Sequence, residues 1–289
     1  MTGHPADFRT AGAWRFVTLR RYSNRARPLV WRARQNRKGL LRDERGHEAL
    51  AIPFWHSSTY NWIIGLVFAI GAMLFMLGAG ASLLPTSWGG IPSGTQIAVI
   101  FFLGSIPFTT AGYLQHFQAA NADDFRPDPK DIRRGDRIAL IGWHPKNPGW
   151  LSTFAQFVGT VAFNFNTFDA INAPSQWLLQ DLVIWGPGMI GSILFLLSGY
   201  LAFIEVCHGY WAWRPKDLDW IIVSINMLGC VFFLVSSLLA FVPAQAEPGW
   251  ILIVANALLG LGALCFFIGA VLLMRESAQA RRAGAPTSA

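Results

Sequence analysis

Long uninterrupted apolar blocks limit what this chain can fold into. Each of six blocks is long enough to cross a hydrocarbon core about 30 Å thick, which takes about 20 residues of helix. The blocks are apolar all round, whereas the strands of a membrane barrel alternate apolar and polar residues. We therefore predict an all-α membrane protein with six transmembrane helices. The predicted spans are 60–84, 96–118, 150–171, 182–206, 219–243 and 249–274.

The basic residues indicate the orientation of these spans. The chain has 23 Lys and Arg, and three of the connections between spans contain none of them. Those connections are 85–95, 172–181 and 244–248. Because basic residues mark the cytoplasmic side of a membrane protein, both termini are predicted to be cytoplasmic. The expected organisation is a basic segment (1–57), a membrane domain (58–275) with a cytoplasmic loop (119–149), and a tail (276–289).

The composition argues against several classes of function. The orientation rule already explains the basic pI of about 9.8, and no fingerprint of a nucleic-acid-binding module accompanies the charge. Three cysteines do not suggest a disulfide framework. Histidines gather near the cytoplasmic face, yet there is no C-x-x-C-H sequence and no close metal-ligand spacing. We predict no catalytic residue, no metal and no cofactor, and a nucleic-acid partner is not expected.

A short pattern recurs in all six apolar blocks. A glycine is followed four residues later by a phenylalanine, with a small or short polar residue three positions further on. Such positions share one helix face, and small residues let membrane helices approach closely. We therefore interpret the pattern as a packing seam. The pairs are Gly71 and Phe75, Gly104 and Phe108, Gly159 and Phe163, Gly191 and Phe195, Gly229 and Phe233, and Gly262 and Phe266.

Two of the blocks also align without gaps. NWIIGLVFAIGAMLFMLGAGASLLP (61–85) can be written over DWIIVSINMLGCVFFLVSSLLAFVP (219–243), which pairs tryptophan with tryptophan and proline with proline. Internal repeats of this kind indicate duplicated structural units. We predict three homologous helical hairpins.

Two stretches of the chain resemble a known family. NWIIGLVFAIGAMLF (61–75) resembles the first helix of the YrhK-like membrane domain of bacteria, and GALCFFIGAVLL (262–273) is similar to its second helix. The family has no assigned activity. The resemblance implies a multi-pass protein of the bacterial cytoplasmic (inner) membrane, and it carries over no catalytic residues.

Polar residues inside the apolar blocks are the candidate binding residues, because polar groups within a membrane are expensive and often functional. Hydrogen bonding between helices is the alternative role for each of them. The candidates are Asn164, Asn166, Asp169, Asn226 and Asn256.

The leading functional hypothesis is a non-enzymatic scaffold, assembly or lipid-interacting component of the membrane. Tryptophans and arginines interleave in the segment 13–41, which suits contact with anionic lipids. A homo-oligomer or a membrane-protein partner is a further expectation. The alternative is a transporter or channel for a small solute, since Pro107 and Pro187 interrupt two spans. A membrane enzyme or haem protein is the third hypothesis.

Overall fold

The structure is a computed structural model that describes residues 9–24, 27–40, 53–85, 90, 92–122, 125, 138–243 and 248–283. Most of these residues are helical, and five of the described helices are long and apolar enough to cross a membrane. These helices support a multi-pass membrane protein with a mostly helical fold. They are Ser58–Leu83, Gly94–Ala120, Trp177–Cys207, Leu218–Leu239 and Gly249–Arg282.

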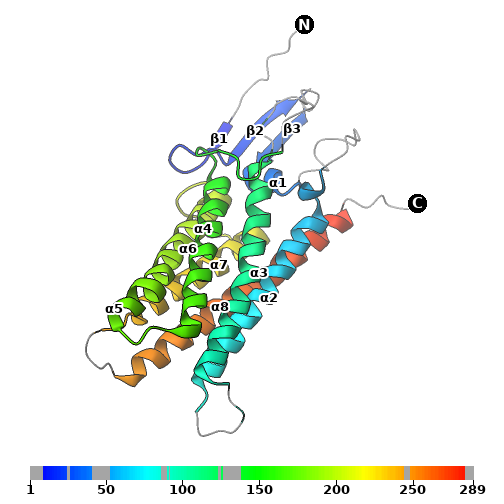
Figure 1. Cartoon of the computed structure of the whole chain (residues 1–289). Coiled ribbons are helices and arrows are strands. Elements are labelled where there is room, and N and C mark those ends of the chain that lie inside the picture. Colours follow the sequence, from blue (N-terminus) through cyan, green and yellow to red (C-terminus); the bar gives the residue numbers. More distant parts are fainter. Residues whose placement is uncertain are drawn as a thin grey trace.

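Six helices form a closed ring in chain order, with each helix packed on the next and the last packed on the first. The ring is elongated along the helix axes (Figure 1). A one-turn helix, α5 (Trp177–Gln180), and a π-helical turn, η3 (Asp181–Trp185), lead into the fourth helix of the ring. The ring helices are α2 (Ser58–Leu83), α3 (Gly94–Ala120), α4 (Pro148–Asp169), α6 (Gly186–Cys207), α7 (Leu218–Leu239) and α8 (Gly249–Ala283).

Side-chain caps fix where several of these helices begin. Ser57, Asn147 and Asp217 each accept a backbone N–H of the first turn that follows. Ser93 and Gln96 bond reciprocally in a capping box at the start of α3. Such caps satisfy N–H groups that have no partner within the helix.

Helix α4, which corresponds to the predicted span 150–171, is not among the five described helices that are long and apolar enough to cross a membrane. Its buried residues include Ser152, Thr153, Thr160 and Thr167, and it lies in the ring between α3 and α6. Several of its hydroxyls bond across the bundle. Ser152 donates to the carbonyl of Ser198, for example, at 2.9 Å. The buried hydroxyl residues of α4 are thus packed against protein.

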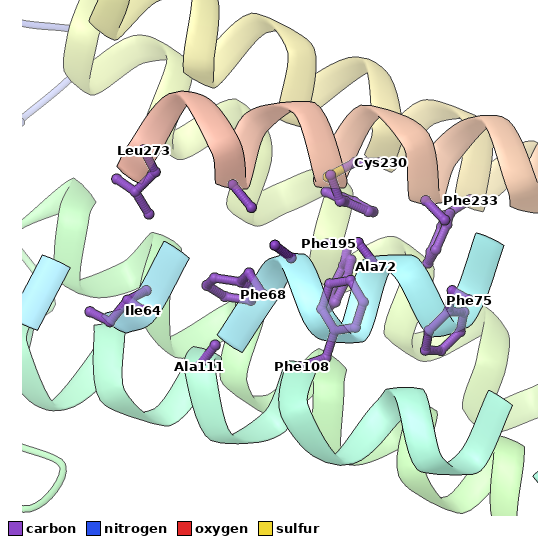
Figure 2. Close-up of a cluster of buried hydrophobic side chains, with 14 of the residues drawn as sticks. Ile64, Phe68, Ala72, Phe75, Phe108, Ala111, Phe195, Cys230, Phe233 and Leu273 are labelled. Carbon is purple, nitrogen blue, oxygen red and sulfur yellow. The ribbon is translucent and has the colours of Figure 1, made fainter. Parts of the chain in front are cut away.

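The centre of the bundle is aromatic. All six phenylalanines of the repeated pattern are buried in one cluster. Four of these phenylalanines are labelled in Figure 2. Phe233 is the hub of this cluster, with ring centroids 5.1 Å from Phe266, 5.8 Å from Phe163, 6.1 Å from Phe75 and 6.3 Å from Phe195. We name the six side chains the phenylalanine core.

In each pair of helices, the pattern glycine of one helix contacts the pattern phenylalanine of the other. A Cβ on Gly71 would lie 2.7 Å from the ring of Phe108, and a Cβ on Gly104 would lie 2.9 Å from the ring of Phe75. The same exchange joins α4 with α6 and α7 with α8. Each glycine therefore makes room for a phenylalanine of the paired helix, as expected of a packing seam.

A small β-sheet precedes the ring and lies at one end of it (Figure 1). Strands β1 (Arg9–Ala11), β2 (Leu19–Asn24) and β3 (Arg27–Arg32) are antiparallel in that order. The short helix α1 (Ala33–Arg37) follows directly, and a 3-10 turn, η1 (Phe54–His56), leads into α2. Sequence analysis did not predict this sheet. We call this end of the molecule the sheet end.

Candidate functional site

Five polar side chains and one glycine line the sheet end of the ring beside α1. One of these residues comes from each ring helix, and we name the six together the polar cup. They are Asn61 on α2, Gln118 on α3, Gly149 on α4, Glu205 on α6, Asp219 on α7 and Glu276 on α8. Asn61, Gln118 and Glu205 are each about 1% exposed, whereas the side chain of Asp219 is 17% exposed, so the cup is buried except at Asp219.

Three basic residues of α1 and its C-cap fill the cup. Arg34 pairs with Asp219 at 2.6 Å and with Glu276 at 2.5 Å. Arg37 pairs with Glu205 at 2.7 Å, and Lys38 also pairs with Glu276. Three cations thus meet three carboxylates from three different helices, so the buried charge is balanced.

Backbone and amide contacts complete the docking of α1. Asn61 donates from Nδ2 to the carbonyl of Lys38 at 2.8 Å. Gln118 donates from Nε2 to Asn61 at 3.2 Å and to the carbonyl of Trp55. The first hairpin, which contributes no carboxylate to the cup, therefore holds the backbone of the segment that carries the cations.

Burial and charge oppose one another at these cations. Burial disfavours the charged form of Arg34, but Asp219 and Glu276 raise its pKa above the ordinary value. Burial, together with the nearby charge of Arg34, lowers the pKa of Lys38 to about 8, although Glu276 acts in the opposite direction. Arg34 is thus a permanent charge of the site, and Lys38 is the cation that titrates closest to neutral pH.

The cup is too tightly packed at Gly149 for a ligand. The Nε atom of Arg37 and the Oε1 atom of Glu205 are buried without a hydrogen-bond partner. Each would lie 2.5 Å from a Cβ placed on Gly149. The Arg37–Glu205 pair therefore has no accessible polar atom at Gly149 that could contact a ligand. Its role is to fix α1 to the ring.

The polar cup has a sequence signal that was missed. Gln118, Glu205 and Glu276 each lie ten residues after the pattern phenylalanine of their helix (108 to 118, 195 to 205, 266 to 276). The other three positions each lie fourteen residues before it (61 to 75, 149 to 163, 219 to 233). Extending the glycine–phenylalanine pattern along each helix would therefore have found the cup.

Among the described residues, no hydrogen bond joins any two of the candidate binding residues chosen from the sequence. Asn166 donates to the carbonyl of Ile184 in η3 at 2.8 Å, and Asn226 lies against Gly269. The Oδ1 atom of Asn164 is buried without a partner.

The remaining two candidates lie on different helices. Asp169 is the last residue of α4, and Asn256 lies near the start of α8; both are half-buried.

The axis of the ring holds almost no free space at the phenylalanine core. The cavity there measures about 10 Å³ and is lined by phenylalanines together with Ser105 and Thr160. That volume is at the lower limit for a single water molecule. A larger pocket of about 630 Å³ lies beside the start of α3, lined by residues from Gly90 to Ile100.

The described histidines make protein contacts. His116 is buried, with its Nδ1 atom 3.2 Å from the hydroxyl of Thr153. His208 lies 3.0 Å from the hydroxyl of Thr18, and burial with two nearby arginines lowers its pKa to about 4. Within the described part of the chain, no group of three or more His, Cys, Asp or Glu could hold a metal ion.

Comparison of the chain with protein-family models, with curated proteins and with solved structures gives no match. The resemblance to the YrhK-like domain therefore stays an expectation from the sequence.

Proposed function

We propose that the chain is a non-enzymatic scaffold of the bacterial inner membrane, with six spans and both termini in the cytoplasm. In this proposal the ring is a sealed anchor, and its task is to hold the β-sheet at a fixed place on the membrane surface for assembly with a partner. The observation that carries the proposal is the occupation of the polar cup by α1. A sheet that only needed to be near the membrane would not need three buried ion-paired cations to fix it.

The distribution of charge supports this placement in the membrane. The connections at the end opposite the sheet carry no Lys or Arg, as the orientation rule requires of an extracytoplasmic face. Helix α4 serves as the sixth span, since its 22 residues reach about 33 Å at 1.5 Å per residue. Its neighbours α3 and α6 cover its buried serine and threonine side chains.

The arrangement of glycines and phenylalanines supports three homologous hairpins. The pairs α2 with α3, α4 with α6, and α7 with α8 each exchange a phenylalanine into the glycine of the partner. The spacing from the phenylalanine core to the polar cup is also the same in all three pairs. A YrhK-like ancestry of such a two-helix unit is part of the proposal.

The exposed surface of the sheet indicates the kind of partner. Arg9, Arg21 and Arg32 on the strands and Arg15 in the connection between β1 and β2 are all exposed, so the surface is basic and suits an acidic face of a membrane-associated protein. Such complementarity mainly sets specificity and the rate of encounter.

The experiment compares the assembly state of the full-length protein in its native membrane with that of the variant Arg9→Glu/Arg15→Glu/Arg21→Glu. The wild type is expected to migrate as a larger complex on a native gel after mild extraction, and the variant as a smaller one. Circular dichroism controls for the integrity of the helices. Equal migration of both proteins at the size of a free chain would contradict the proposal.

A small-solute transporter is the second candidate function, because π-helical turns inside helices frequently mark functional sites. Here η3 accepts a hydrogen bond from Asn166, and Asn164 has an unpaired buried oxygen nearby on the same helix. The phenylalanine core would have to move for any solute to pass. Solute flux into liposomes that carry the purified protein, above the flux of empty liposomes, would replace the scaffold proposal with this one.

A further inference from the structure

Two connections at the sheet end are built alike. The residues Trp143-His144-Pro145-Lys146-Asn147 precede α4, and Trp213-Arg214-Pro215-Lys216-Asp217 precede α7. In each, the backbone N–H of the last residue donates to the carbonyl three positions earlier, at 2.9 Å and 3.0 Å. Proline occupies the second position of each turn, which it favours, and lysine follows it at the tip. We name these segments the Trp–Pro–Lys turns.

Each turn holds an exposed indole on a buried one. Trp143 is 76% exposed and stands edge-on to Trp150 at a centroid distance of 5.6 Å; Trp213 is 70% exposed and stands edge-on to Trp220 at 5.0 Å. Each inner tryptophan is buried, and its Nε1–H donates to a carbonyl of the connection, Ile141 at 3.0 Å or Ala212 at 2.7 Å. The outer indoles are therefore held in place while most of their surface stays exposed.

The lysines of the two turns lie close to the start of a ring helix. Asn147 and Asp217 cap the first turns of α4 and α7, so each lysine lies two residues before a ring helix begins. The corresponding place before α2 differs, since Trp55 there is half-buried against Phe117 and no lysine follows it. The paired feature thus belongs to the second and third hairpins only.

We propose that the two Trp–Pro–Lys turns anchor the protein to anionic phospholipid headgroups. This inference rests on the proposed placement of the ring in the membrane. Indoles are amphipathic and concentrate at the membrane–water interface, and a lysine at the cytoplasmic surface is attracted to anionic lipid. Each turn presents both groups just before a membrane helix begins. There the indole can lie in the glycerol region of the lipids, and the ammonium group of the lysine can pair with a phosphate.

The test measures which lipids the full-length protein retains. The wild type is reconstituted in nanodiscs of equal parts phosphatidylglycerol and phosphatidylcholine, and the retained lipids are counted by native mass spectrometry. We expect the wild type to retain phosphatidylglycerol in excess. The variant Lys146→Gln/Lys216→Gln should lose this preference by about fivefold for each lysine removed, and Lys146→Arg/Lys216→Arg should keep it.

Two further variants separate the turns from general charge and from the indoles. Arg275→Gln/Arg282→Gln removes two exposed cations outside the turns and should leave the preference unchanged. Trp143→Leu/Trp213→Leu should reduce the number of retained lipids of both kinds.

An equal loss of preference in the Arg275→Gln/Arg282→Gln control would overturn the proposal, as would an unchanged preference in Lys146→Gln/Lys216→Gln. If Lys146→Gln/Lys216→Gln instead changed the size of the complex in native membranes and left lipid retention unchanged, the turns would bind a protein partner and not lipid. A wild type that retained no lipid would point to failure of the membrane placement itself, not of the turns.

Discussion

Glu276 is the residue on which the docking of α1 depends most, because it pairs with both Arg34 and Lys38. Removing one member of a buried ion network leaves its partners charged and unpaired, which typically costs about 3–5 kcal/mol. We expect Glu276→Ala to lower the free energy of unfolding by about that amount, measured by denaturant titration in detergent micelles.

The matched control for Glu276→Ala is Lys38→Met, which removes one cation and leaves the Arg34–Glu276 pair in place. Because Glu276 keeps Arg34 as its partner in this variant, no carboxylate is left without a cation, and a much smaller change is expected. If Lys38→Met were the more damaging of the two, the assignment of Glu276 as the centre of the network would be wrong.

Lys38 also predicts a pH dependence. Its pKa is lowered from the ordinary 10.5 to about 8, so the folded protein binds fewer protons than the unfolded chain between these two values. The contribution of Lys38 to stability therefore rises with pH across the window from about 8 to 10.5, by at most about 1.4 kcal/mol per pH unit. Below about pH 8, Lys38 is charged in both states, and the cost of burying its charge lowers the free energy of unfolding by its full amount.

Chemical denaturation at a series of pH values from 7 to about 10.5 checks this dependence. Lys38→Met should flatten the profile in that range. A slope that is the same in the variant and in the wild type would assign the dependence to another group.

The ion network could not be predicted from local sequence. Arg34, Arg37 and Lys38 belong to an arginine-rich segment that is typical of a surface or of contact with lipid. Their partners are remote, since Arg37 and Glu205 are 168 positions apart and Arg34 and Glu276 are 242 apart. Only the constant spacing between the phenylalanine core and the polar cup links these positions.

At the scale of elements, the reciprocal exchange of glycine and phenylalanine makes a contrasting prediction for two glycines. A Cβ on Gly262 would collide with the ring of Phe233, whereas nothing lies within 4 Å of a Cβ on Gly80. Gly262→Ala should therefore destabilise the protein by about 1–3 kcal/mol through overpacking. Gly80→Ala should stabilise it by up to about 1 kcal/mol, because alanine is the better helix former.

Thermal unfolding of both variants in the same detergent measures this contrast. Equal effects of the two substitutions would mean that the helices of a pair are not held together by the close approach that the structure shows.

The extents of the helices were the most predictable part of the fold. Each predicted span corresponds to a ring helix, with ends that agree within a few residues for α2, α3 and α4. Helix α8 instead continues to Ala283, beyond the apolar residues that defined the prediction. Its last turns pack on protein, where Glu276 and Ser277 are buried, so hydropathy alone could not show where it ends.

The sheet was unpredictable for a related reason. Its strands are three to six residues long and rich in arginine, which hides the alternation that identifies a half-buried strand.

At the scale of the whole molecule, α1 should hold the sheet on the ring without help from the chain that follows it. A protease site inserted between Arg45 and Gly46 would cut the chain outside the described residues. After cleavage we expect the amino-terminal fragment to stay with the ring during size-exclusion chromatography, because its three cations are paired inside the polar cup.

The same insertion in a Glu205→Ala/Glu276→Ala background is the control. There the fragment should separate, since only Asp219 remains to pair with α1. Separation of the fragment in the otherwise unchanged protein would show that the cup does not bind α1 on its own.

The polar cup also constrains the order of events during synthesis. The three cations of α1 leave the ribosome first, but Glu276 is supplied by the last helix of the ring. Three cations are too costly to bury before their carboxylates are present. Helix α1 can therefore dock in the polar cup only after α8 is inserted. A docked α1 thus indicates that the membrane domain is complete.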